Sequence, residues 1–93
     1  MAKIIETNLS IGNYGEILDH QSRVIEVDSW EDYVNEIRNG VSIERNDLYG
    51  TLHGRSIQSN VTIENFQSDN HHLECDVQND RFKSKKLAYL ILE

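Results

Sequence analysis

The sequence has a single cysteine, no proline and no long apolar run, and two of these absences restrict the possible structures. Cys75 has no second cysteine to pair with, so the chain forms no internal disulfide. No apolar stretch approaches the roughly 18 residues that a membrane-spanning helix needs. The first residues also lack the apolar segment of a secretory signal. We therefore expect a cytoplasmic protein without membrane contact, whereas the missing proline indicates nothing about activity.

Several motifs that carry chemistry are also missing. Neither glycine pattern of the common phosphate-binding loops occurs, and there is no Gly-x-Ser-x-Gly nucleophile motif. The 93 residues are enough for one domain with one modest core. These observations predict a single domain, 1–93, that is not an enzyme and carries no cofactor.

Charge is the most uneven property of the chain. The 16 acidic residues outnumber the 9 basic ones and give a net charge of -7, with most of the excess in residues 1–50. An acidic protein repels nucleic acid and anionic membranes at long range. A short basic stretch, 81–86, does not reverse this, so we expect no direct nucleic-acid binding. The charge favours a basic protein as the partner.

Most of the chain has the pattern of short strands. Residues 3–11 alternate apolar Ile5 and Leu9 with polar Glu6 and Asn8, which is typical of a strand. Residues 12–15 are rich in glycine and asparagine and predict a turn. Residues 16–19 and 23–27 follow as strands, with a hairpin predicted about residues 19–22.

The second half has the same character. After short strand patterns at 41–43 and 48–53, with a turn at Asn46-Asp47, residues 60–67, 71–78 and 82–92 predict three consecutive strands. Residues 87–92 are apolar on both parities, as in a central strand covered on both faces or an edge strand awaiting a partner. A helix over 82–92 is the alternative, because Leu, Ala and Lys favour helices.

Residues 30–39 carry the clearest helix pattern in the chain. Ser29 occupies the position of an N-cap, acidic residues follow in the first turn, and Gly40 is a typical C-terminal cap. Apolar residues recur at helical spacing, at Trp30, Tyr33, Val34 and Ile37. The predicted fold is α+β: one amphipathic helix packed on an antiparallel sheet of about five to six strands, with a C-terminal β-meander.

The polar face of this helix is the first candidate site. It presents four carboxylates at helical spacing, Asp28, Glu31, Asp32 and Glu36. Neighbouring like charges destabilise a helix by a few tenths of a kcal/mol each. A basic groove on a partner would offset that cost, although a solvated helix face explains the pattern as well.

A second candidate site lies at residues 71–76, which include His71, His72 and Cys75. In a strand His71 and Cys75 would be about 13 Å apart, too far apart to share one metal ion. Only a helix would bring His72 close to Cys75. We therefore predict no metal site, with these three residues as weak candidates and a metal-dependent hydrolase as a remote alternative.

Size, charge and the lack of a catalytic set together favour a small acidic binding protein. Our hypothesis is an inhibitor that occupies the basic groove of a nucleic-acid-binding protein, with Asp28, Glu31, Asp32 and Glu36 in place of phosphates. Phage anti-defence proteins such as anti-CRISPRs are comparable in size and charge, which is an analogy only. The alternative is a homo-oligomeric assembly or accessory subunit that pairs through residues 87–92 as a homodimer.

Overall fold

The computed structural model describes residues 1–45, 54–58, 61–78 and 82–93, and for 41–45 and 54–58 it describes the backbone alone. These residues form one helix and seven strands. Their order and bounds are β1 (Ala2–Ile11), β2 (Ile17–Val27), α1 (Trp30–Arg38), β3 (Val41–Arg45), β4 (Gly54–Gln58), β5 (Thr62–Ser68), β6 (His72–Gln78) and β7 (Lys83–Leu92).

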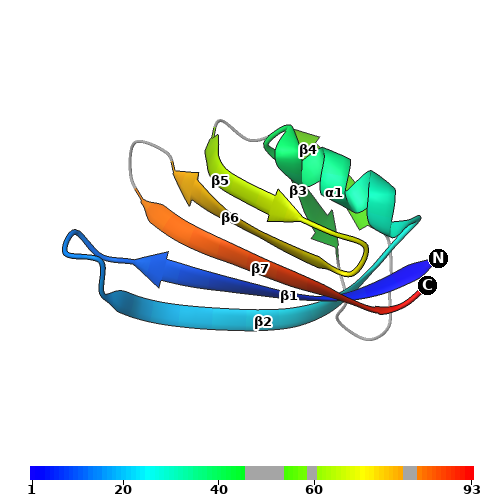
Figure 1. Cartoon of the computed structure of the whole chain (residues 1–93), viewed down its shortest axis with the longest axis horizontal. Coiled ribbons are helices and arrows are strands. Elements are labelled where there is room, and N and C mark those ends of the chain that lie inside the picture. The colour runs from blue at the N-terminus through cyan, green and yellow to red at the C-terminus, as the bar shows by residue number, and fades with distance from the viewer. Residues whose placement is uncertain (46–53, 59–60, 79–81) are drawn as a thin grey trace.

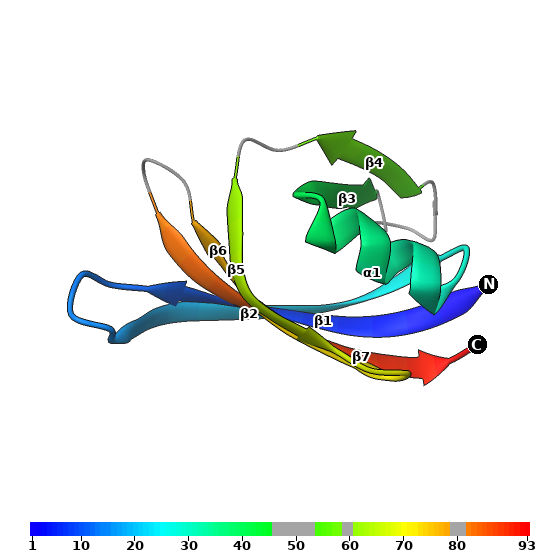
Figure 2. The ribbon, with the colours of Figure 1, turned by 45° about the horizontal axis from the view of Figure 1, so that its top comes forward.

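Five of these strands form one antiparallel sheet in the order β2-β1-β7-β6-β5 (Figure 1). The predicted α+β class is confirmed, and β5, β6 and β7 form the expected meander. The main sheet has five strands and not six, because β3 and β4 pair only with each other within the described residues. Their ribbon lies beside α1, on the same side of the main sheet (Figure 2).

Helix α1 forms where the sequence predicts it. The Ser29 side chain accepts a hydrogen bond from the backbone N–H of Asp32 at 3.1 Å, which is the expected N-cap contact. At the other end Gly40 has a φ of 75°, a conformation that glycine adopts without steric cost. The predicted apolar face is buried in full, at Trp30, Tyr33, Val34 and Ile37.

The first hairpin differs from its prediction. The turn at residues 12–15 forms, with the Gly15 N–H donating to the Gly12 carbonyl at 3.0 Å. The hairpin predicted about residues 19–22 is wrong, because β2 runs unbroken through them and Ser22 pairs with Thr7. These residues are exposed on the outermost strand of the sheet. A polar strand exposed on both faces has no apolar alternation and resembles a turn in sequence.

Residues 83–92 form a strand and not a helix, and this strand lies inside the sheet. Strand β7 pairs with β1 on one side and with β6 on the other. Both of its backbone edges are used over residues 83–89, so residues 87–89 have no free edge for a second copy. The central position agrees with one of the two predictions from their apolar character, although a described element covers only one face of the strand.

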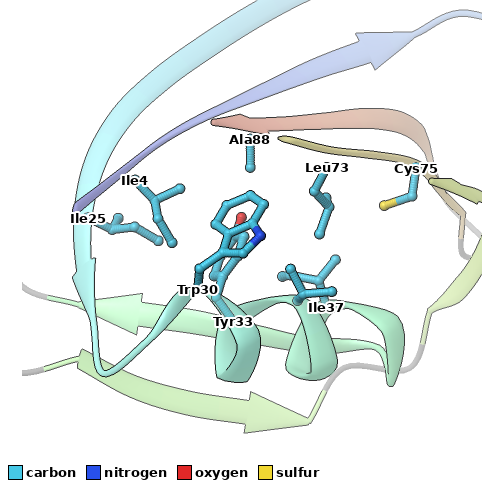
Figure 3. Packing of buried hydrophobic residues seen from close by; sticks show 9 residues of the cluster. Ile4, Ile25, Trp30, Tyr33, Ile37, Leu73, Cys75 and Ala88 are labelled. Carbon is cyan, nitrogen blue, oxygen red and sulfur yellow. The ribbon is translucent and has the colours of Figure 1, made fainter. Parts of the chain in front are cut away.

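The core lies between α1 and one face of the five-stranded sheet (Figure 3). Side chains of the helix meet Ile4 and Ile25 at one end and Leu73 and Cys75 at the other, with Ala88 between them. The face of β1 that turns toward the helix is that of Ala2, Ile4 and Glu6. The opposite parity, with Ile5 and Leu9, lies on the other face of the sheet, which no described element covers.

Two expectations fall outside the described residues, the turn at Asn46-Asp47 and the strand at 48–53. Within the described part of the chain, no helix is long and apolar enough to cross a membrane.

Candidate functional site

The structure places the four predicted carboxylates of the helix in two different environments. Asp28, Glu31 and Asp32 are exposed around the N-terminal end of α1. No ion pair among the described residues joins any of the three to a basic side chain. Glu36 is half-buried and has an interaction within the protein. Three of the four carboxylates are therefore available to a partner.

A fourth exposed carboxylate comes from a distant part of the chain. The Trp30 indole N–H donates to the backbone carbonyl of Asp69 at 2.8 Å and so fixes the turn between β5 and β6 against the start of the helix. Backbone N–H groups of His71 and His72 donate to the Asp69 carboxylate. The His71 hydrogen bond, more than that of His72, lowers the Asp69 pKa below its ordinary value. Asp69 therefore remains charged beside the helix.

We call the surface formed by Asp28, Glu31, Asp32 and Asp69 the acidic end. Sequence patterns identified the three helix residues but missed Asp69, which is 37 positions further along the chain than Asp32. Its place depends on the Trp30 contact, and no periodicity of the sequence encodes that contact. The start of α1 and the turn between β5 and β6 lie toward the end of the molecule that also holds both chain termini (Figure 1).

The second candidate site does not assemble. In β6, Leu73 and Cys75 face the core, whereas His72 lies on the other face with its ring centroid 4.8 Å from that of Tyr89. His71 is exposed ahead of the strand. Burial raises the pKa of the Cys75 thiol to about 11, so it remains protonated at neutral pH. Among the described residues no group of three or more His, Cys, Asp and Glu side chains is placed to hold a metal ion.

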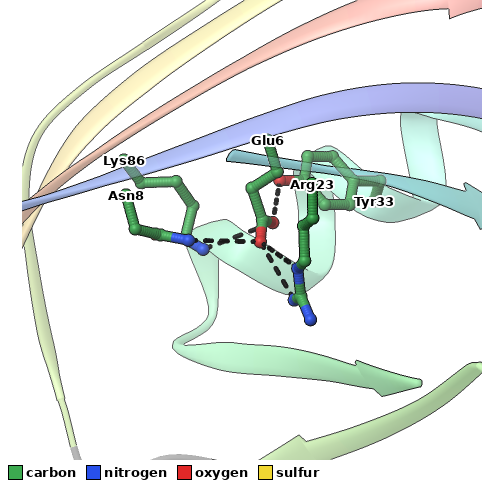
Figure 4. Close-up of polar contacts among 5 residues, drawn as sticks. All are labelled: Glu6, Asn8, Arg23, Tyr33 and Lys86. Atoms are coloured by element: carbon green, nitrogen blue, oxygen red, sulfur yellow. Dashed lines mark hydrogen bonds and ion pairs between the residues drawn. The ribbon is translucent and has the colours of Figure 1, made fainter. Parts of the chain in front are cut away.

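The structure instead shows a polar cluster around Glu6, which is 1 % exposed (Figure 4). One carboxylate oxygen, Oε1, accepts from Nε and Nη2 of Arg23, both at 3.0 Å. The other, Oε2, accepts from the Tyr33 hydroxyl and lies 3.3 Å from Nζ of Lys86. The Asn8 amide is a further, longer contact at 3.5 Å. Each carboxylate oxygen therefore contacts one cation, Arg23 at Oε1 and Lys86 at Oε2, and Oε2 also accepts the Tyr33 hydrogen bond.

These neighbours determine the charge of the cluster. Burial alone raises the pKa of Glu6, but Lys86, the hydrogen bond from Tyr33 and Arg23 outweigh it and hold the pKa below its ordinary value. Burial, the Glu6 charge and the shared hydrogen bond raise the pKa of Tyr33 far above its ordinary value. At neutral pH the cluster thus holds one carboxylate, two cations and a neutral phenol.

This cluster presents no nucleophile to a substrate, because the hydrogen bonds described above join its members to one another. It links three neighbouring strands to the helix, because Arg23 comes from β2, Glu6 from β1, Lys86 from β7 and Tyr33 from α1. Glu6 was predicted only as a polar position of the first strand. Its partners follow from strand register, which the sequence pattern does not contain.

Comparison with family models, with curated proteins and with solved structures finds no match for this chain. Its functional interpretation therefore depends on its own residues.

Proposed function

We propose that this chain is a non-enzymatic binding protein whose acidic end engages a basic protein partner. The Trp30–Asp69 hydrogen bond carries the proposal, because it joins a charged turn to the N-terminal end of the helix, where the three exposed carboxylates lie. On an isolated helix, two or three acidic residues in the first turn serve the helix dipole. Asp69, from another element, does not serve that dipole. Its carboxylate accepts from the backbone N–H groups of His71 and His72, and its charge enlarges the surface that a basic partner meets.

The partner that suits this surface best is a protein with a nucleic-acid groove. Side chains at helical neighbour positions have Cβ atoms about 5–6 Å apart, so their carboxylates can meet neighbouring lysines and arginines that line such a groove. The net charge of -7 steers the chain toward a positive surface. The chain would act by occupying the groove and excluding nucleic acid, so it would need neither a catalytic group nor a cofactor.

A capture experiment with matched variants tests this proposal. The immobilised chain is exposed to lysate of its native host in about 50 mM and 500 mM salt, since screening weakens contacts between exposed charges. We expect a basic, nucleic-acid-binding protein to be retained at low salt and released at high salt. The triple variant Asp28→Asn, Glu31→Gln, Asp32→Asn should retain about a tenth as much of it or less.

The control variant removes the same charge from another part of the molecule. Glu16→Gln, Asp19→Asn and Glu64→Gln neutralise three exposed carboxylates outside the acidic end, and this protein should retain the partner within about twofold of the native chain. Equal losses in both variants would mean that net charge alone attracts the partner. That result, or no loss in either, would exclude the acidic end as the binding site.

A second candidate function, self-assembly, has its own structural support. Val24, Ile5 and Tyr89 form one row across β2, β1 and β7 on the uncovered face of the sheet. Val24 is 51 % exposed and Tyr89 48 %. The same face carries cations on β7 (Lys83, Lys85) beside acids on β6 (Glu74, Asp76). A surface with both charges beside an apolar row is complementary to itself, as a twofold interface requires.

The occupant of this face would be a second copy of the chain, packed face to face. Sedimentation of the purified protein at about 100 µM, far above the micromolar dissociation constant of a weak dimer, should then give twice the mass of the chain. Tyr89→Lys should give the monomer, while Tyr14→Lys, which changes an exposed tyrosine in the first turn, should leave the dimer intact. A native chain that is monomeric at this concentration would exclude the assembly.

A further inference from the structure

A cavity of about 450 Å³ lies on the helix side of the five-stranded sheet. Ile37 and Gly40 border it, which places it at the C-terminal end of α1, away from the acidic end. Its volume is within the range of about 300–1,000 Å³ that is usual for small-molecule sites. Neither the acidic end nor the uncovered face of the sheet contributes to it.

The lining of this cavity is divided between polar and apolar side chains. Asn8, Gln21 and Lys86 supply hydrogen-bonding groups from the three neighbouring strands β1, β2 and β7. Ile63, Val77 and Ile37 supply apolar surface from β5, β6 and the helix. A ligand that satisfies both parts has a polar head and an apolar body.

The charge of the lining is determined by the Glu6 cluster. Lys86 reaches the cavity with a side chain that is only 14 % exposed, and Glu6 lies 3.3 Å from its Nζ. A lysine ammonium has three N–H donors, so Lys86 can meet a bound anion in addition to its ion pair with Glu6. A second cavity of about 430 Å³ shares Asn8 and Gln21 with the first and is lined by Arg23. Arg23 and Lys86 are thus the basic side chains that line the two cavities among the described residues, and both contact Glu6.

We propose that the larger cavity binds a small amphipathic organic anion, with its carboxylate near Lys86 and its aliphatic body against Ile63 and Val77. The Lys86 ammonium at the cavity wall favours an anionic head over a neutral one and repels a cation. Hydrogen bonds to charged groups are worth more than those between neutral groups. The Asn8 and Gln21 amides supply further donors to the same head. This site does not depend on the acidic end.

The test uses three probes that share one chain length and differ in head group: octanoate, octanol and octylammonium. Calorimetric titration of the native protein should show saturable binding of octanoate at one site. Octanol should bind about tenfold more weakly or worse, because it lacks the charge that Lys86 meets. Octylammonium should show no saturable binding. Equal binding of all three probes, or no binding of octanoate, would overturn the proposal.

Two variants locate the site, and a third is their control. Lys86→Met should reduce octanoate affinity by about tenfold or more, whereas Lys85→Met should leave it within about twofold, because adjacent residues of a strand face opposite sides of the sheet. Ser84→Phe places a ring in the cavity without touching Glu6 and should abolish binding even if Lys86→Met does not fold. Unchanged octanoate affinity in a folded Ser84→Phe protein would exclude this cavity.

Discussion

Glu6 holds a negative charge at a buried position because donors surround both of its oxygens. Removing one member of a buried ion pair leaves the other members uncompensated. We expect Glu6→Gln to reduce the free energy of unfolding by about 2–4 kcal/mol at pH 7, less than for a fully buried pair because Arg23 is partly solvated. Urea unfolding at pH 7 measures this loss, and a loss below about 1 kcal/mol would contradict the role of the cluster.

The same carboxylate predicts how stability depends on pH. Its native pKa lies below the ordinary value of 4.5. As pH falls below 4.5, the unfolded chain takes up a proton before the folded one does, so this part of the stability is present above 4.5 and is lost in acid. The difference in unfolding free energy between the native protein and Glu6→Gln should therefore narrow from pH 7 to pH 3. If the difference in unfolding free energy stayed constant from pH 7 to pH 3, the lowered pKa of Glu6 would be contradicted.

Cys75 gives a prediction of its own. Its thiol is 1 % exposed and its pKa is raised to about 11, so little thiolate forms near pH 8. The folded protein should react with a thiol reagent at least about a hundredfold more slowly than the urea-unfolded chain, in which the pKa returns toward about 8.5. Fast labelling of the folded protein would show that Cys75 is accessible.

The sequence predicted the burial and contacts of a residue only where its partners are close to it along the chain. The buried positions of the helix follow from a spacing of three and four residues, so Trp30, Tyr33 and Ile37 were predictable. Glu6 was not, because one partner is 17 residues away and another is near the end of the chain. Asp69 was missed for a similar reason, since the Trp30 contact spans 39 residues.

The helix itself depends on its two ends. Gly40 adopts a φ of 75° where the chain leaves α1 toward β3, and its N–H donates to the Ile37 carbonyl at 3.0 Å. A Cβ in this left-handed conformation costs about 1–2 kcal/mol. Gly40→Ala should therefore destabilise the protein by that amount, and Gly40→Asn by less, because asparagine tolerates this region. Thermal unfolding of both variants measures which one is destabilised more. Equal losses of stability would contradict the role of the left-handed conformation at Gly40.

Strands were predictable when one face was apolar and difficult when both were polar. Residues 71–78 alternate clearly, and β6 buries Leu73 and Cys75 as their parity indicates. Strand β2 is exposed over most of its length, so residues 19–22 resembled a turn. In β7 the apolar character indicated a central strand, which is confirmed. Its second face is nevertheless uncovered by the described elements, and that face is the basis of the self-assembly candidate.

Charge and hydrophobic surface are separated in the folded chain. The acidic end carries the exposed carboxylates of the helix and of the β5–β6 turn, the uncovered face carries the apolar row, and the cavity lies at the other end of α1. The sequence located the acidic excess in residues 1–50 and on the helix. It did not indicate that a turn from the second half would join it, because that association is tertiary.

The most direct test of the acidic end is competition between this chain and nucleic acid for one partner. With a basic protein captured as described above, labelled duplex DNA is titrated into it at increasing concentrations of the chain. We predict that the apparent dissociation constant of the DNA rises in proportion to chain concentration, and that the Asp28→Asn, Glu31→Gln, Asp32→Asn variant has at most about a tenth of that effect. A complex containing the partner, the DNA and the chain together would contradict the account.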